Sequence, residues 1–186
     1  MRDSKMKRHH PHLVALHWLL ALMIIVALVM GGIILGKTPN SDPEKIGHLQ
    51  THMSLGTLIL ILMVARFAVR LLKPRPAPAE SGNPVLKWLG PLVHYLFYLV
   101  VIAMASSGLA TAILAGLPEI VFGGTGEPLP ASFDDIPPRA AHGILSILLM
   151  ILIVLHLAGF VFHQFIRKDH LFERMWFARK SGGEKS

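Results

Sequence analysis

Residues 141–166 read AHGILSILLMILIVLHLAGFVFHQFI, an apolar run without Asp, Glu, Lys or Arg that contains three histidines. The run exceeds the roughly 20 residues that a helix needs to cross a hydrocarbon core about 30 Å thick. Its apolar residues are continuous rather than alternating, which argues against a strand of a membrane barrel. Because the bilayer core offers no water to the backbone, we expect this run to form a membrane-spanning helix.

Three further apolar runs, 13–36, 50–72 and 85–115, are also long enough to cross the hydrocarbon core. Hydrophobic residues make up 53% of the chain, more than one soluble core of this size needs. We therefore predict an all-α fold, an integral membrane four-helix bundle that forms a single domain over residues 1–186. Its helices are expected at about 13–36, 42–72, 85–115 and 138–167.

The predicted starts of two helices rest on local signals. Ser41-Asp-Pro-Glu44 is a cap-like stretch that begins the second helix outside the membrane, near Asp42. Asp135, followed by Pro137 and Pro138, predicts a similar start for the fourth helix. The proline- and glycine-rich stretch 116–138 predicts a loop with at most a short helix.

The basic residues are distributed unevenly between the two sides of such a bundle. Fifteen of the 18 Lys and Arg lie in the N-terminal arm, the 66–87 connection and the C-terminal tail, whereas Lys37, Lys45 and Arg139 lie opposite. By the positive-inside rule, we expect a bacterial inner-membrane protein with both termini in the cytoplasm. The net charge of +7 then reflects topology and contact with anionic membrane lipid, and no nucleic-acid partner is implied.

Histidine is the residue type that carries the chemistry suggested by this sequence. The chain has no cysteine, which excludes thiolate-held iron–sulfur clusters, disulfides and covalently attached c-type haem. It has 11 histidines, and several lie inside apolar runs, where polar side chains are costly and indicate a function. No Asp or Glu lies within the four runs, which disfavours a histidine–carboxylate path for metal transport.

The depths of the histidines predict how they pair. His142 and His156 are 14 residues apart, which is close to four helical turns and about 21 Å along the axis, so they face the same way at two levels. The first helix carries His17 near its cytoplasmic end, at the level of His156. The second carries His52 near its outer end, at the level of His142. Two imidazoles on facing helices can fill both axial positions of a haem iron; the alternative for each histidine is an interhelical hydrogen bond.

Small residues near these histidines are expected to leave room for a flat macrocycle. They are Ala21, Gly56, Gly143 and Gly159. Small residues also let membrane helices approach closely, so any single glycine has this simpler explanation.

At these residues the sequence resembles the prokaryotic cytochrome b561 family. The matching stretches, from His12 to about Met175, are Leu16-His-Trp18, His52-Met-Ser-Leu-Gly56, Val64-Ala-Arg-Phe-Ala-Val-Arg70 before a proline-rich loop, His94 leading into Tyr98, and His142 through Leu155-His156 to His163 and Arg167-Lys-Asp169. The resemblance implies a four-helix membrane protein with two haem b groups. It implies that His17 and His156 hold the iron of the cytoplasmic-side haem. It likewise implies that His52 and His142 hold the outer haem iron.

Four further residues are candidates for contacts with a quinone or with haem propionates: His163, His94, Arg66 and Arg70. His163 follows His156 by seven residues, so it lies on nearly the same face and about 10 Å closer to the cytoplasm. The two arginines lie one turn apart at the cytoplasmic end of the second helix, where a guanidinium can pair with a carboxylate. The simpler roles are contacts with lipid phosphate at the membrane surface.

The function predicted from these features is transmembrane electron transfer by a b-type di-haem cytochrome. Some members of the resembled family are described as superoxide oxidases that pass electrons to ubiquinone. We accordingly expect an outer donor, with superoxide as one candidate, and ubiquinone as acceptor, with no catalytic residue beyond the haems. The six acids of the outer loops would on average repel an anion, although Lys37, Lys45 and Arg139 could form a local basic patch.

Three alternatives remain at this point. The chain could be a pure electron carrier between redox partners, one of them on the outer side. It could be the haem-bearing membrane anchor of a hydrogenase or dehydrogenase. It could also be a helical membrane protein that binds its partners without redox chemistry.

Overall fold

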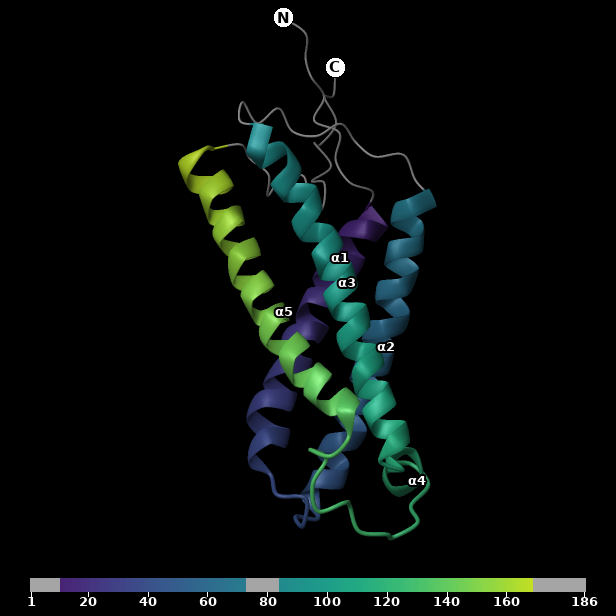
Figure 1. Cartoon of the computed structure of the whole chain (residues 1–186). Helices are drawn as coiled ribbons and strands as arrows, with labels where there is room; N and C mark the ends of the chain where they lie inside the picture. Colours follow the sequence, from purple (N-terminus) through teal and green to yellow (C-terminus); the bar gives the residue numbers. More distant parts are fainter. Residues whose placement is uncertain (1–10, 73–83, 169–186) are drawn as a thin grey trace, which may run out of the picture.

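The structure is a computed structural model that describes residues 11–72 and 84–168, and throughout these ranges its regular elements are helices (Figure 1). In chain order they are α1 (Pro11–Val29), the π-helix η1 (Met30–Leu35), α2 (Glu44–Leu72), α3 (Pro84–Leu114), the short α4 (Leu117–Val121), α5 (Pro137–Val161) and the π-helix η2 (Phe162–Ile166). Among the described residues, four segments are long and apolar enough to cross a membrane: His12–Leu35, Glu44–Leu72, Gly90–Leu114 and Pro137–Ile166. The predicted all-α fold with four spanning helices is confirmed.

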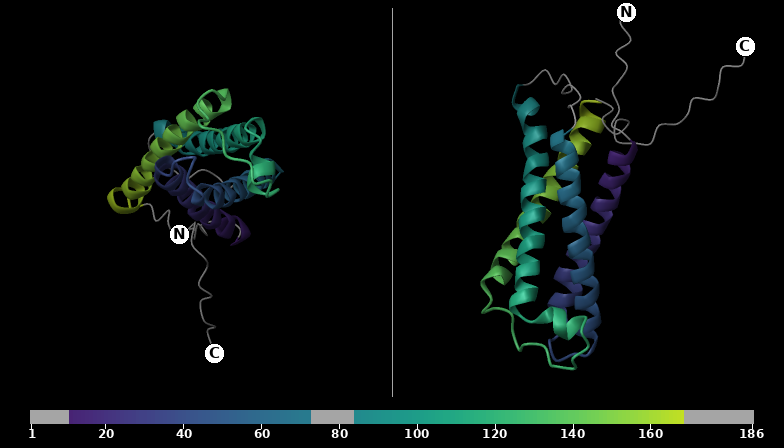
Figure 2. Two further views of the ribbon diagram at one scale, coloured as in Figure 1. Left: turned by 90° about the horizontal axis from the view of Figure 1, so that it is seen from below. Right: turned by 90° about the vertical axis from the view of Figure 1, so that its right-hand side faces the viewer.

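The bundle has two ends that differ in what they carry. The start of α1, the end of α2, the start of α3 and η2 lie at one end, which we call the terminal end (Figures 1 and 2). The other end carries α4 and the connections 36–43 and 122–136, and we call it the loop end. Consecutive spanning helices therefore run in opposite directions (Figures 1 and 2).

The packing of the helices leaves one side of the bundle less closely joined. α3 packs against both α5 and α2, and α2 packs against α1, whereas α1 and α5 make few direct contacts. The core between the helices is apolar, and Leu149 at its centre is fully buried against side chains such as Val101 and Met63. Many large hydrophobic side chains face outwards, as expected for a surface that meets lipid.

The two predicted helix starts have different outcomes. α2 begins at Glu44, where the Asp42 carboxylate accepts a hydrogen bond of 2.9 Å from the Glu44 amide, so the predicted cap is present. α5 begins at Pro137 with proline in its first turn, so the predicted start is confirmed, but Ile136 holds the cap position and no side chain caps the helix, so Asp135 is not its cap. A proline in the first turn has no amide hydrogen to satisfy, which reduces the need for a cap.

The first membrane helix ends in a π-helical stretch, η1, that the sequence pattern did not predict. Its last carbonyl, that of Leu35, accepts a hydrogen bond from the Lys45 ammonium, which also donates to the carbonyl of Thr38 at 2.6 Å. Lys45 is only 6% exposed. A cation suits the carbonyl-rich end of a helix. Lys45 therefore does not belong to a surface patch with Lys37 and Arg139, and the expected basic patch is wrong in this respect.

The loop end is closed by contacts between its two connections. The Asn40 side-chain amide donates a 2.7 Å hydrogen bond to the carbonyl of Pro130. A second apolar cluster, with Leu117 and Val121 of α4 at its centre, packs against Leu129 and Phe133 of the long connection. The short helix allowed for within 116–138 is thus α4, and it joins the loops to the ends of the spanning helices.

Candidate functional site

At the loop end, α2 and α5 bring two histidine rings together. The ring centres of His52 and His142 are 6.2 Å apart, and their planes are inclined by 84°. Both side chains are partly buried. The structure therefore joins the two histidines that their depths predict at this level.

The His142 ring is fixed in its orientation by α3. Its Nδ1 is 2.8 Å from the Met104 carbonyl oxygen, so Nδ1–H is the donor and Nε2 keeps a free lone pair. The Ser107 hydroxyl lies 3.5 Å from the same nitrogen. A hydrogen bond of this kind from the second ring nitrogen is what orients histidines that ligate metals and strengthens their basicity. With Nδ1 engaged by α3, Nε2 is the ring nitrogen of His142 that remains available to a ligand.

Both rings of this pair lie against a glycine of a neighbouring helix. A Cβ added at Gly108 of α3 would lie 2.9 Å from Cε1 of His142, and one added at Gly31 of η1 would lie 3.2 Å from Cε1 of His52. A larger residue at Gly108 would displace the His142 ring, and one at Gly31 would crowd the His52 ring. The two glycines therefore define where the imidazoles can stand.

One nitrogen of the His52 ring is not satisfied by the described residues. Its Nδ1 is buried and has no hydrogen-bond partner in the part of the chain that the structure describes, and the same holds for Nδ1 of His48 one turn earlier. A buried nitrogen without a partner is costly in an apolar interior. The unsatisfied nitrogens at this level fit a site that is completed by a group from outside the protein chain.

At the terminal end, α1 and α5 form the second pair. The ring centres of His17 and His156 are 6.4 Å apart with planes inclined by 62°. Two rings from α3 also contact His156: His94 with centres 5.7 Å apart, and Phe97 with centres 5.4 Å apart. The second predicted pair is thus also brought together, and it bridges the two helices that make few direct contacts.

The spacing within each pair fits one shared iron atom. With metal–nitrogen bonds of about 2 Å and each ring centre about 1 Å beyond its nitrogen, two axial imidazoles have centres about 6 Å apart. Both observed separations agree with this value. Within residues 11–72 and 84–168, no three His, Asp or Glu side chains gather as a metal-binding group, so a metal at either pair needs its remaining ligands from another molecule, as a porphyrin provides.

The glycines expected to make room for a macrocycle are not those that touch the rings. A Cβ added at Gly56 or Gly159 would meet nothing within 4 Å, and one at Gly143 would meet only the Arg139 guanidinium, at 3.5 Å. Gly31 and Gly108 were missed because they lie on other helices than the histidines they contact. The only sequence signal for these two positions is a glycine inside an apolar run. Such a glycine does not show which helix, or which histidine, it faces.

The candidates near the terminal-end pair have distinct surroundings. Nδ1 of His94 lies 2.7 Å from the Gly90 carbonyl oxygen, one turn earlier in α3. The Arg70 guanidinium lies over the Tyr95 ring at 5.1 Å, and its buried Nε has no hydrogen-bond partner among the described residues. Nη1 of Arg66 donates a 2.9 Å bond to the Leu13 carbonyl. Arg66 therefore joins α2 to α1 through this hydrogen bond. The Nε–H group of Arg70 remains an unused hydrogen-bond donor among the described residues.

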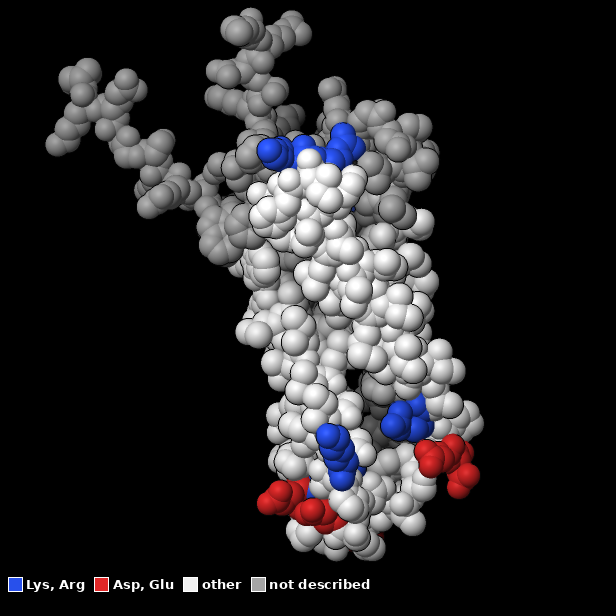
Figure 3. Space-filling model, turned by 90° about the vertical axis from the view of Figure 1, so that its left-hand side faces the viewer, with Lys and Arg blue, Asp and Glu red and all other residues white. Residues whose placement is uncertain are grey.

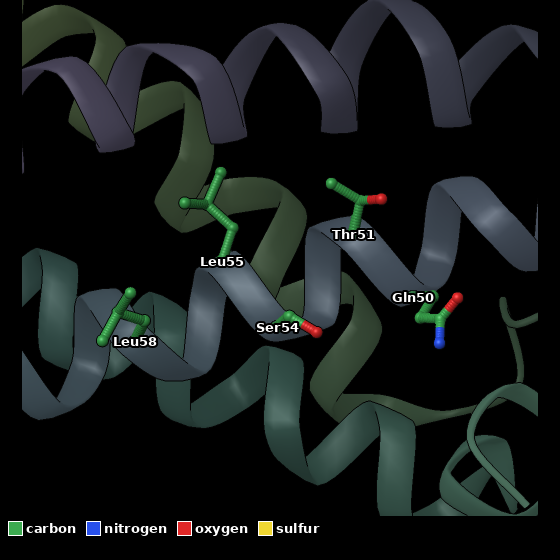
Figure 4. Close-up of a pocket in the computed structure, with 5 residues that line it drawn as sticks. All are labelled: Gln50, Thr51, Ser54, Leu55 and Leu58. Carbon is green, nitrogen blue, oxygen red and sulfur yellow. The ribbon is translucent and has the colours of Figure 1, made fainter.

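His163 lies in η2, beyond His156 towards the terminal end, with its ring centre 5.6 Å from that of Phe162. A separate hollow of about 480 Å³ lies along α2 towards the loop end. It is lined by Gln50, Thr51, Ser54, Leu55 and Leu58 on successive turns (Figure 4). None of the paired histidines lines it, so the paired rings and not this hollow define the candidate site.

A membrane bundle with histidine pairs at two levels defines the class of helical haem-binding membrane proteins. Comparison with known proteins gives the family: the model of prokaryotic cytochrome b561 matches residues 8–178, and the chain belongs to that family. Membership implies binding of b-type haem and electron transfer in a bacterial membrane.

Individual relatives agree with this assignment. The chain is 30% identical over 168 residues to a Yersinia pestis protein named probable superoxide oxidase CybB, with 87% of this chain and 92% of that protein covered. It is 29% identical to cytochrome b561 homolog 2 of Escherichia coli, with 87% of each covered. It is 24% identical to cytochrome b561 homolog 1 of the same organism, with 94% of this chain and all of that protein covered.

Proposed function

We propose that this chain holds two haem b groups and carries electrons across the bacterial inner membrane, from a donor on the outer side to ubiquinone. His17 and His156 hold one haem, and His52 and His142 hold the other. When bound, the haems supply the one-electron redox chemistry. The observation that carries the proposal is the pair of ring separations, 6.4 Å and 6.2 Å, at two levels of one bundle.

The protein between the two levels separates electrons from protons. Leu149 lies seven residues from each α5 histidine and is fully buried, with Val101 equally enclosed beside it. The layer around them is largely apolar, with Tyr98 as a polar member of the same cluster, so it offers water few hydrogen-bond partners. Electrons can cross between the levels while ions are held back.

The distribution of charge supports the orientation of the bundle. The terminal end carries the excess of Lys and Arg, which favours a cytoplasmic position for it and for both chain termini. The loop end then faces outwards, and the His52–His142 pair belongs to the outer haem. An outer donor, whether a redox protein or a small molecule, would approach this end.

Superoxide is the donor suggested by the name of the Yersinia relative. Each superoxide would give up one electron and leave as dioxygen, and two such electrons with two protons would convert ubiquinone to ubiquinol. Protons are needed only at the quinone, so that site should carry groups that relay them. His163 and His94, with Arg70 nearby, are such groups at the terminal end.

Haem quantification tests the proposal directly. Because four ligands in two pairs hold two irons and no cysteine is present to attach haem, the purified chain should contain two haems, both extractable. Pyridine haemochrome analysis against protein mass, on protein expressed with supplied haem, measures this ratio. A ratio of one in fully loaded protein would contradict the two-level arrangement, and a missing Soret band would reject haem binding altogether.

A further inference from the structure

We propose that the Arg139 guanidinium binds a propionate carboxylate of the loop-end haem, so that this site selects a haem with free carboxylates. The inference rests on the proposed function, because it requires His52 and His142 to hold that haem. It assigns Arg139 a ligand-binding role that the histidine pairs alone do not imply.

The position of Arg139 brings its charge to the loop-end pair. Arg139 lies in the first turn of α5, three residues before His142. Its Nη1 lies 3.5 Å from where a Cβ at Gly143 would stand, so the guanidinium lies along its own helix beside the pair. Its positive charge acts on the rings of both His52 and His142.

The charge of the exposed Arg139 side chain is not paired within the part of the chain that the structure describes. No carboxylate among the described residues forms an ion pair with its guanidinium, and its backbone amide donates a 2.8 Å hydrogen bond to the Ile136 carbonyl. The nearby acid Asp134 instead accepts a bond from the Ser132 hydroxyl. A cation in the first turn of a helix is also opposed by the helix dipole. An anion beside Arg139 would offset both features.

A hollow near the loop end lies on the same side of the bundle as α5 (Figures 1 and 3). Figure 3 shows the face on which α5 lies in Figure 1, and basic side chains there border a hollow near the loop end. The basic residues of this end are Lys37, Lys45 and Arg139, and Lys45 is buried against helix carbonyls. A haem between α2 and α5 could direct its polar edge to this membrane surface, where a guanidinium pairs well with a carboxylate.

The test compares haem b with its dimethyl ester, which lacks the negative charges. Full-length protein would be stripped of haem and titrated with each compound in detergent, and the loop-end component would be identified as the one missing in His52→Ala. Wild type should bind haem b at the loop-end site about tenfold or more tightly than the ester, the gain of a hydrogen bond between charged groups. In Arg139→Gln the ratio of the affinity for haem b to that for the ester should fall to about one. Arg139→Lys should keep part of the preference for haem b.

The terminal-end component provides the internal control, because its preference should not change in either variant. If Arg139→Gln still preferred haem b to the ester as strongly as wild type does, the inference would be overturned. If reduction by superoxide also slowed in that variant, Arg139 would serve the donor instead. Failure of Arg139→Gln to bind either compound would also overturn it, because the role would then be structural. If wild type itself showed no loop-end component, the proposed function would fail before the inference.

Discussion

At the scale of single residues, the loop-end site is shaped by glycines that face histidines across helix boundaries. Gly108 of α3 and Gly31 of η1 each lie against one imidazole. On α3, Met104 lies one turn from Gly108 and supplies the carbonyl that orients His142. One short stretch of α3 therefore both makes room for the ring and sets its direction.

Gly108→Ala tests this arrangement. The new Cβ would lie 2.9 Å from Cε1 and 3.0 Å from Nδ1 of His142, so the ring must move away and lose its bond to Met104. Overpacking of this kind costs about 1–3 kcal/mol. Spectral titration should show weaker haem binding at the loop-end site and no change at the other. Gly56→Ala, where the Cβ meets nothing within 4 Å, is the matched control, and equal behaviour of the two variants would contradict the packing account.

His163→Ala tests the proposed quinone site. The variant should keep both haem components, because His163 is not one of the paired ligands. Reoxidation of the reduced protein by added ubiquinone should slow by roughly a hundredfold, the size of effect that a positioned proton-transfer group has. Stopped-flow spectra measure the rate, and His12→Ala, an exposed histidine at the same end, is the control. Wild-type rates in His163→Ala would move the quinone site to His94 or to the loop end.

The residue scale also shows what the sequence could and could not predict about the site. The pairings followed from helix order and the rise per residue, because depth in a membrane helix depends only on position along the chain. The contacts around the rings did not follow. Gly31 and Gly108 touch His52 and His142 through the rotation and register of neighbouring helices, which no spacing within one helix determines.

At the scale of the elements, the spans were predictable and their local irregularities were not. The length and apolar character of the runs set the bounds, so α3 at Pro84–Leu114 lies within one residue of the expected 85–115 at each end. The π-helical stretches η1 and η2 depart from the expected pattern. A π turn differs from an α turn by the insertion of one residue and depends on tertiary contacts for its stability.

Lys45→Met tests how η1 is held in place. The variant keeps the length of the side chain and removes the bonds of the ammonium to the carbonyls of Leu35 and Thr38. Losing charged hydrogen bonds at a buried position should destabilise the fold by about 2 kcal/mol. Thermal unfolding should show a lower Tm, and hydrogen exchange should rise first in residues 30–38. Lys37 is an exposed lysine at the same end, and Lys37→Met should change neither quantity. Equal effects of the two variants on Tm and hydrogen exchange would argue against a role of Lys45 in holding η1.

At the scale of the whole molecule, the bundle is less closely packed between α1 and α5 than between its other neighbouring helices. α1 and α5 make few direct contacts, yet each contributes a ring to the terminal-end pair. Groups held by the histidines would connect the less closely packed helices, so haem should contribute to the stability of the fold as well as to its redox function. The two histidine pairs lie at different levels of the bundle, one towards each end, with the apolar core between them.

The most direct test of the central claim is the dithionite-reduced visible spectrum of the four single histidine variants. His17→Ala and His156→Ala should each remove the same spectral component and leave the other. His52→Ala and His142→Ala should each remove the complementary component. If His17→Ala instead removed the component that His142→Ala removes, the pairing of ligands at two levels would be contradicted.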